Sequence, residues 1–214
     1  MGTKKTVFVI YYSTYGHIEK MAHSVCKGLK KSGVNVKLFR IAETLSPEVL
    51  EKMHVPKKEN SVPVITPDKL KEADGYLFGF PTRFGIIPEQ VKTFFDSCGQ
   101  LWMNSALSNK FVGTFFSTGS IGQGQESTAF FCIPFFAHMG MIFVPIGTKH
   151  KILGENSIVH GGSAYGAGCI AIANEPNSLE LELAEFQGQD FGKIVSKYNV
   201  DSHSKKSSRI CNIV

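Results

Sequence analysis

The amino-acid sequence predicts a doubly wound α/β fold, in which helices cover both faces of a parallel sheet. Short apolar runs without polar alternation recur along the chain, as expected for strands buried on both faces. Segments with helical spacing of apolar residues separate these runs. This alternation continues through most of the 214 residues without an internal repeat, which favours one α/β domain.

The first predicted strand is the run V-F-V-I-Y-Y at residues 7–12. A turn at residues 13–16 leads into a predicted helix, which should end at Gly33 because glycine commonly follows the last helical turn. Its apolar face consists of Ile18, Met21, Ala22, Val25 and Leu29. A second strand is expected at residues 34–41. Residues 42–72 are polar and contain four prolines, so short helices and loops are expected there.

The same alternation continues through the second half of the chain. Further strands are expected at 75–80, 111–116 and 141–144, and helices at about 88–98, 126–138 and 178–198. A Gly-rich loop is expected at 161–168. The prediction is therefore a five-stranded parallel sheet in a domain over residues 1–198, followed by a flexible basic tail over residues 199–214.

Composition and charge exclude several classes of function. Hydrophobic residues make up 43% and charged residues 19% of the chain, which is typical of a globular protein. The formal charge is +5, but most of it comes from Lys4, Lys5 and the last 14 residues. The body is therefore close to neutral, which argues against nucleic acid as a partner.

The cysteines and the apolar segments favour a cytoplasmic protein without a bound metal. The chain has five cysteines, an odd number, with no C-x-x-C motif and no compact Cys/His cluster. Its start lacks the long apolar region of a signal peptide. Residues 129–147 contain no charged side chain, but Pro134, Gly140 and Pro145 interrupt them. We therefore expect a buried helix followed by a buried strand, and no membrane span.

Three predicted strands end in loops of similar chemistry. Because ligands of such sheets bind at the carboxyl ends of the strands, the three loops together predict one composite site. The first loop consists of Ser13, Thr14, Tyr15, Gly16, His17 and Ile18; the second of Pro81, Thr82, Arg83, Phe84 and Gly85; and the third of Ser117, Thr118, Gly119, Ser120, Ile121 and Gly122.

The first loop has the character of a monophosphate site. It precedes a helix, whose first N–H groups favour an anion, and Ser13 and Thr14 add hydroxyl donors. It matches neither G-x-x-x-x-G-K-[ST] nor G-x-G-x-x-G, so no lysine is placed for a triphosphate. The alternative interpretation is a Ser/Thr-rich helix cap that binds nothing.

The other two loops favour a flavin over an empty cap. Phe84 and Tyr15 offer flat apolar surfaces, and the glycines of the third loop allow the backbone to approach a ligand closely. Arg83 would hold a ring carbonyl or a phosphate, unless it is a solvated surface charge. A planar ring with one phosphate describes flavin mononucleotide (FMN), a cofactor that carries the redox chemistry itself.

Seven motifs resemble those of the WrbA-type flavodoxin-like NAD(P)H:quinone oxidoreductases. They are Y-Y-S-T-Y-G-H-I, P-T-R-F-G, G-x-L-W, S-T-G-S-I-G-Q-G-Q-E, A-H-M-G-M, V-P-I-G and H-G-G-S-A-Y-G-A, and the likeness extends over residues 6–197. This resemblance implies a flavodoxin-like fold, FMN as cofactor and two-electron reduction of quinones by NADH or NADPH. It also implies a homotetramer in equilibrium with dimers.

The resemblance also implies roles for individual residues. Residues 13–18 would hold the FMN phosphate, residues 82–84 would line the isoalloxazine ring, and residues 117–122 would hold its polar edge. Tyr15 would touch the nicotinamide nucleotide, His138 would face the flavin, and Trp102 would form a wall of the substrate pocket from a neighbouring subunit. The chain departs from the family at Met139, where many relatives have a second histidine, and at Gln123, where relatives usually have glycine.

A single flat pocket would serve the nucleotide and then the quinone, which predicts a ping-pong hydride transfer. Two-electron transfer would avoid radical products and so protect against redox cycling. The alternative is a flavodoxin-like FMN-binding scaffold or regulatory protein at membranes, with little turnover.

The ends of the chain carry two further motifs. Cys211 has the C-a-a-X spacing of a prenylation site and follows Lys205, Lys206 and Arg209, so a lipid and a basic patch would together give peripheral membrane association. Asn212 is not aliphatic, and the alternative is a polar tail with a chance cysteine. The start fits the myristoylation pattern at Gly2, although Thr6 already belongs to the first predicted strand.

Overall fold

A parallel sheet forms the centre of the protein in the computed structural model, which describes residues 4–56, 61–173 and 175–198. The strands along its main path have the order β2-β1-β3-β4-β5. Their bounds are β1 Thr6–Tyr11, β2 Asn35–Arg40, β3 Gly75–Pro81, β4 Phe111–Thr118 and β5 Ile142–Phe143. Every pairing is parallel. The doubly wound α/β fold is thus confirmed, with β1, β3 and β4 buried at its centre.

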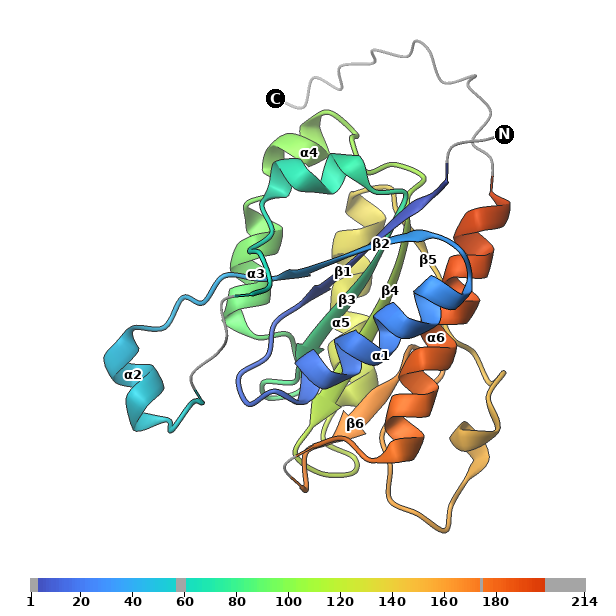
Figure 1. Ribbon diagram of the computed structural model, residues 1–214. Coiled ribbons are helices and arrows are strands. Elements are labelled where there is room, and N and C mark those ends of the chain that lie inside the picture. The colour runs from blue at the N-terminus through green and yellow to red at the C-terminus, as the bar shows by residue number, and fades with distance from the viewer. Residues whose placement is uncertain (1–3, 57–60, 174, 199–214) are drawn as a thin grey trace.

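Helices cover both faces of the sheet (Figure 1). One face carries α1 and α6, and the other carries α3, α4 and α5. The bounds are α1 His17–Lys31, α2 Pro47–Lys52, α3 Glu89–Asp96, α4 Gly99–Met103, α5 Gln125–His138 and α6 Ser178–Lys197. The short helix η1 spans Pro67–Glu72, and a further short helix, η2, spans Lys151–Gly154. Because α2 and η1 both fall within residues 42–72, the short helices expected there are confirmed.

Alternation along the strands divides the core into two halves. Phe8 and Ile10 of β1 contact the half beneath α3 and α5, whereas Val7 and Val9 contact the half beneath α1 and α6. Because both halves are apolar, each strand reads as a continuous apolar run. The apolar face expected for the first helix is also confirmed, since all five of its residues are buried in α1.

The structure corrects two details of the sequence prediction. A sixth strand, β6 Gly168–Ile170, pairs with the end of β4, where only a Gly-rich loop was expected. Glycines and a length of three residues hide it from a pattern search. A separate short helix, α4, follows α3, because the chain turns at Ser97 and Cys98 between them.

A third correction concerns α5, which was expected to be buried. Thr128, Ala129 and Cys132 are buried, but Phe130 and Phe131 are exposed on the opposite side. From Ala129 to Ala137 the helix is apolar on every side, yet only one side can pack against the sheet. In the part of the chain that the structure describes, no helix has the length and apolar character to cross a bilayer.

Candidate functional site

The three predicted loops converge at the carboxyl edge of the sheet. Hydrogen bonds extend the strand pairing into them, from Tyr12 N–H to Gly79 C=O at 2.9 Å and from Thr82 N–H to Ser117 C=O at 2.8 Å. A cavity of about 200 Å³ opens between the loops. All three loops line it, together with Ala171, which follows β6. The three loops therefore meet at one cavity within one chain.

The first loop wraps the start of α1. Gly16 adopts φ +92°, a conformation that glycine allows without strain, and its N–H donates to Ser13 Oγ at 3.1 Å. Ser13 and Thr14 are buried beside the cavity. The first N–H groups of α1 have no partner within the helix and carry its positive dipole end. His17 also lines the cavity, and its ring Nε2 lies 2.7 Å from Ala173 C=O.

Arg83 connects the second loop to the first. Its Nη2 donates to Thr14 Oγ1 at 2.9 Å, and its Nη1 donates to Thr82 C=O at 3.0 Å. The half-buried Arg83 side chain therefore lines the cavity and is hydrogen-bonded to both loops. None of the described residues that line this cavity is acidic. A phosphate matches this lining of cation, hydroxyls and amide groups.

Phe84 lies at the rim of the second loop. Arg83 and Ile86 exchange backbone hydrogen bonds across a tight turn, which holds Phe84 at φ +54° and Gly85 at φ +81°. The Phe84 side chain is 103% exposed, so it contributes no packing to this chain. Tyr15 is also exposed, and its hydroxyl donates to Met53 C=O at 3.1 Å. Both rings are available to a planar ligand.

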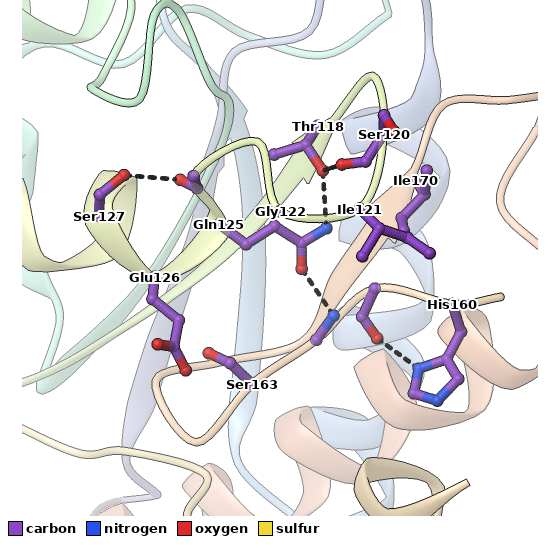
Figure 2. A pocket seen from close by; sticks show the side chains of 13 residues that line it. Thr118, Ser120, Ile121, Gly122, Gln125, Glu126, Ser127, His160, Ser163 and Ile170 are labelled. Carbon is purple, nitrogen blue, oxygen red and sulfur yellow. Dashed lines mark hydrogen bonds between the residues drawn. The ribbon is translucent and has the colours of Figure 1, made fainter. Parts of the chain in front are cut away.

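The third loop separates the first cavity from a larger one. This second cavity has a volume of about 520 Å³ and lies between residues 118–127 and residues 160–163 (Figure 2). Thr118 lines both cavities and is buried, whereas Ser120, Ile121 and Gly122 are exposed. The third loop is thus buried at Thr118 and exposed to solvent after it.

Two of the predicted residues do not join this cluster within one chain. His138 is the last residue of α5, about 20 Å along the helix from Gln125. Trp102 lies on α4, and α4 and the end of α5 both lie near the edge where the strands begin (Figure 1). The expectation that His138 faces the flavin is therefore not met by the chain's own fold. Cys211 and Gly2 lie outside the described residues.

Burial holds several titratable groups of the protein in their neutral forms. Burial raises the pKa of Tyr12 to about 12, and its hydroxyl donates to Glu43. Burial also raises the pKa of Cys26 to about 11 and of Cys98 to about 12. A thiol with so high a pKa is a poor nucleophile. Across residues 4–56, 61–173 and 175–198, no group of three His, Cys, Asp or Glu side chains is placed to hold a metal.

Several residues that shape the site were not predicted from the sequence. Ala171 lines the first cavity, and Gln125 bridges the third loop to the Gly-rich segment. Glu180 is buried and receives hydrogen bonds from Gly161 and Ile170. The spacing N-S-L-E from Asn177 to Glu180 is a capping-box signal, which indicates the start of α6 and draws attention to Glu180.

Comparison with known proteins identifies the family. Residues 6–149 match the family model described as NADPH-dependent FMN reductase. The chain is 50% identical over 202 residues to the quinone-oxidoreductase QR2 of Triphysaria versicolor, covering 92% of this chain and 97% of that protein. It is 46% identical over 195 residues to a probable NAD(P)H dehydrogenase (quinone), FQR1-like 2, of Arabidopsis thaliana, covering 89% of this chain and 71% of that one.

Solved structures support the fold. A flavodoxin, WrbA-like protein from Agrobacterium tumefaciens superimposes with a TM-score of 0.63 at 21% identity, covering 90% of this chain and 98% of that one. At this level of identity the likeness shows a flavodoxin-like fold and nothing about activity. Together with the family model and the close relatives, it confirms the resemblance seen in the sequence. The chain therefore belongs to the flavodoxin-like NADPH-dependent FMN reductase family.

Proposed function

We propose that the chain is an FMN-dependent NAD(P)H:quinone oxidoreductase, an NAD(P)H dehydrogenase (quinone) that reduces quinones by two electrons and protects against redox cycling. The observation that carries the proposal is the cavity at the carboxyl edge of the sheet. Hydroxyls, helix-terminal N–H groups and Arg83 converge there with no acidic side chain in the described lining. The family model and the names of the relatives support the same activity.

Different residues of the cavity would contact different parts of the cofactor. Ser13, Thr14 and the first N–H groups of α1 would hold the phosphate, because they combine hydroxyl donors with a positive dipole end. Residues 82–84 would line the ring, and residues 117–122 would contact its polar edge. When bound, FMN supplies the redox chemistry, since it accepts two electrons from a reduced nicotinamide and delivers them to a quinone.

Phe84 and Tyr15 would flank the entrance to the flavin. Both side chains are exposed, and each offers a flat surface against which a nicotinamide or a quinone can stack. If both substrates use this one surface, they must bind in turn, which supports a ping-pong order. Crossing double-reciprocal plots, the sign of a ternary complex, would contradict it.

The test of this proposal is NADH oxidation by the FMN-loaded protein, with and without benzoquinone. Fast oxidation that depends on the quinone is expected, and free FMN at the same concentration is the control. An Arg83→Ala variant should bind FMN less tightly, because it loses the cation that spans the cavity. Bound flavin that oxidises NADH no faster than free FMN would contradict the proposal and favour a scaffold or regulatory protein.

We also propose that the protein works as a homodimer or homotetramer. Trp102 and Met103 on α4 and Phe130 on α5 expose 54%, 70% and 61% of their area, respectively. Exposed apolar side chains of this size commonly mark interfaces. A neighbouring copy would also explain how Trp102 and His138 could reach a flavin, since within one chain they lie at the opposite edge of the sheet.

Peripheral membrane association through residues 199–214 is a further proposal, for a protein that otherwise works in the cytoplasm. It is supported by Lys205, Lys206 and Arg209, which precede Cys211 and would attract an anionic lipid surface. The test is incorporation of labelled isoprenoid into the full chain and into a Cys211→Ser variant. Incorporation into both proteins, or into neither while a prenylated control protein is labelled, would contradict prenylation at Cys211.

A further inference from the structure

Gln125 is the first residue of α5 and lies between the third loop and the Gly-rich segment 161–170 (Figure 2). It lines the second cavity and not the first, so it lies outside the proposed FMN site. Its amide connects Thr118 of the third loop to Cys169, which lies 44 residues after Gln125 in the chain.

All the hydrogen-bonding groups of the Gln125 amide have partners. Nε2 donates to Thr118 Oγ1 at 3.0 Å and to Cys169 C=O at 3.1 Å, and Oε1 accepts from Gly162 N–H at 2.7 Å. These partners fix the orientation of the amide, because a backbone carbonyl can only accept and a backbone N–H can only donate. Neither a carboxylate nor an apolar side chain could satisfy all three.

Two glycines of the segment are shaped around this amide. A Cβ atom at Gly161 would collide with Gln125 Nε2, and one at Gly168 would collide with Gln125 Oε1. Glycine is therefore required at both positions for the amide to enter. The sequence predicted only a Gly-rich loop here, but these glycines form a slot for a side chain of the same protein.

Side chains of α6 hold the Gly-rich segment in place by hydrogen bonds. Glu180 is 1% exposed, and its Oε1 accepts from Gly161 N–H at 2.9 Å and from Ile170 N–H at 2.8 Å. Gln187 holds the same segment further along, since its Oε1 accepts from Ala167 N–H at 2.9 Å and its Nε2 donates to Thr114 C=O at 2.9 Å. Gln125 therefore ties the third loop to a rigid support on α6.

The tie acts on the third loop through one hydroxyl. Thr118 Oγ1 accepts the hydrogen bond from Gln125 and donates its own proton to Ser120 C=O at 3.0 Å. With the acceptor side occupied, the hydroxyl is oriented and the turn from Thr118 to Ser120 is fixed. Without Gln125, the hydroxyl would be free to rotate, and the exposed residues beyond it would lose their anchor.

We propose that Gln125 is a positioning residue for the flavin: through Thr118 it presets the third loop that would hold the polar edge of the ring. This inference rests on the proposed function for its effect on FMN, but the tie between Gln125 and Thr118 is a property of the chain alone. The two can therefore be tested separately.

The experiment compares Gln125→Met with Gln187→Met. Both variants replace a hydrogen-bonded amide by an apolar side chain of similar size, and both remove hydrogen bonds to the Gly-rich segment. Similar losses in melting temperature are expected. Only Gln125→Met should increase amide hydrogen exchange at residues 118–122 in the cofactor-free protein. Only Gln125→Met should weaken FMN binding, by about ten-fold, and alter the visible spectrum of the bound flavin.

A second substitution keeps the test decisive if Gln125→Met folds poorly. Gln125→Glu preserves the side-chain volume and the acceptor for Gly162 N–H but loses both donors at neutral pH. FMN affinity should fall and then recover partly as the pH is lowered, because the protonated carboxyl can donate to Thr118 again. The parent protein, measured over the same pH range, corrects for the titration of FMN itself.

A double-mutant cycle with Thr118→Val decides whether Gln125 acts through Thr118. If it does, adding Gln125→Met to Thr118→Val should weaken FMN binding by less than about two-fold further. Additive losses, an equal loss in Gln187→Met, or unchanged exchange at residues 118–122 would each overturn the inference. Failure of the unsubstituted chain to bind FMN would instead overturn the proposed function, while the exchange measurement would still decide the tie.

Discussion

At the scale of single residues, Phe84 combines two features that do nothing for the stability of the chain. Its side chain is fully exposed, and its backbone adopts φ +54°, which costs about 1 kcal/mol or more for a residue other than glycine. The turn between Arg83 and Ile86 imposes this conformation. Such strain supports the proposed role of Phe84 in contacting a ligand.

Replacement of Phe84 should therefore separate activity from stability. Phe84→Gly relieves the backbone strain and removes no buried side chain. The free energy of unfolding should therefore stay within about 1 kcal/mol of the parent value. Quinone reduction should fall about ten-fold, because the stacking surface is lost. Denaturant unfolding and steady-state kinetics provide the two measurements. Phe84→Tyr, which keeps the ring, should retain activity; equal activity of Phe84→Gly would contradict the assigned role.

At the scale of elements, the contact between α1 and α6 depends on glycines that allow the two backbones to approach. A Cβ atom at Gly188 would overlap the carbonyl oxygen of Val25, and one at Gly28 would overlap that of Glu185. A larger residue would push the helices apart and open the core between them, where Val25, Leu29 and Leu183 are buried.

Gly188→Ala should destabilise the protein by about 2–3 kcal/mol, although alanine has the higher helix propensity. Urea unfolding followed by circular dichroism measures this loss. The matched control is Gly99→Ala in the short helix α4, where a Cβ atom would meet no neighbour within 4 Å. The control should be neutral or slightly stabilising, and a loss of the same size in both variants would contradict the close-contact explanation.

The same two helices are joined by an ion-pair cluster that predicts a pH dependence. Lys27 Nζ lies 2.7 Å from Glu185 Oε2, and Lys31 pairs with the other carboxylate oxygen. Hydrogen bonds from these lysines lower the pKa of Glu185 below 4.5, its ordinary value. A lowered pKa means that the carboxylate stabilises the folded state above pH 4.5 and that this contribution is lost as the pH falls through the folded-state pKa.

Glu185→Gln should accordingly lower the free energy of unfolding by about 0.5 kcal/mol at pH 7 and low salt. The difference from the parent protein should shrink as the pH falls below 4.5 and should also shrink in 1 M salt, because exposed ion pairs are screened. Paired denaturation curves at several pH values measure both effects. A difference that grows on acidification would show that the sign of the argument is wrong.

At the scale of the whole molecule, the apolar outer side of α5 is the feature that one chain leaves unsatisfied. Phe130 and Phe131 face away from the sheet, next to the buried side formed by Thr128, Ala129 and Cys132. A helix that is apolar all round requires cover on both sides. A second copy of the chain would supply this cover and is the basis of the proposed oligomer.

Phe130→Glu should therefore shift the protein toward monomers, because it places a charge in the proposed interface. Sedimentation velocity measures the change. If Trp102 and His138 act from a neighbouring copy, the loss of oligomers should also lower turnover. The circular dichroism spectrum should not change. Glu126→Lys, an exposed charge on the first turn of the same helix, is the control. A parent protein that sediments as a monomer at micromolar concentration would contradict the oligomer.

Most of the fold could be predicted from the sequence, because each buried strand is a local run and each helix carries its own periodicity. The strands at 7–12, 75–80 and 111–116 correspond to β1, β3 and β4 for this reason. The missed strand β6 is different, since it is only three residues long and is hydrogen-bonded by Glu180 and Gln125, which are remote from it in the chain. No local pattern records such a remote hydrogen bond.

Some parts of the candidate site could also be predicted from the sequence and others could not. The three loops were predictable because parallel strands bring their carboxyl ends to one edge, so neighbours in the sheet are neighbours in the site. The position of His138 was not predictable, because α5 places it at the far edge of the sheet. The resemblance to the family does not say whether His138 faces the flavin of its own chain or that of a neighbouring copy. The slot for Gln125 was hidden because glycines indicate both mobility and close packing.

Both ends of the described domain lie at the edge of the sheet remote from the cavity (Figure 1). The N–H of Thr6 at the start of β1 bonds Asp74 at 2.8 Å, and the ring of Tyr198 after α6 packs on Phe111 at the start of β4, with ring centroids 5.0 Å apart. A linker fused before Thr6 or after Tyr198 would therefore leave on the side away from the cavity. A protein coupled to a bead or an electrode through either linker would present its flavin edge to the solution, a favourable geometry for an amperometric sensor.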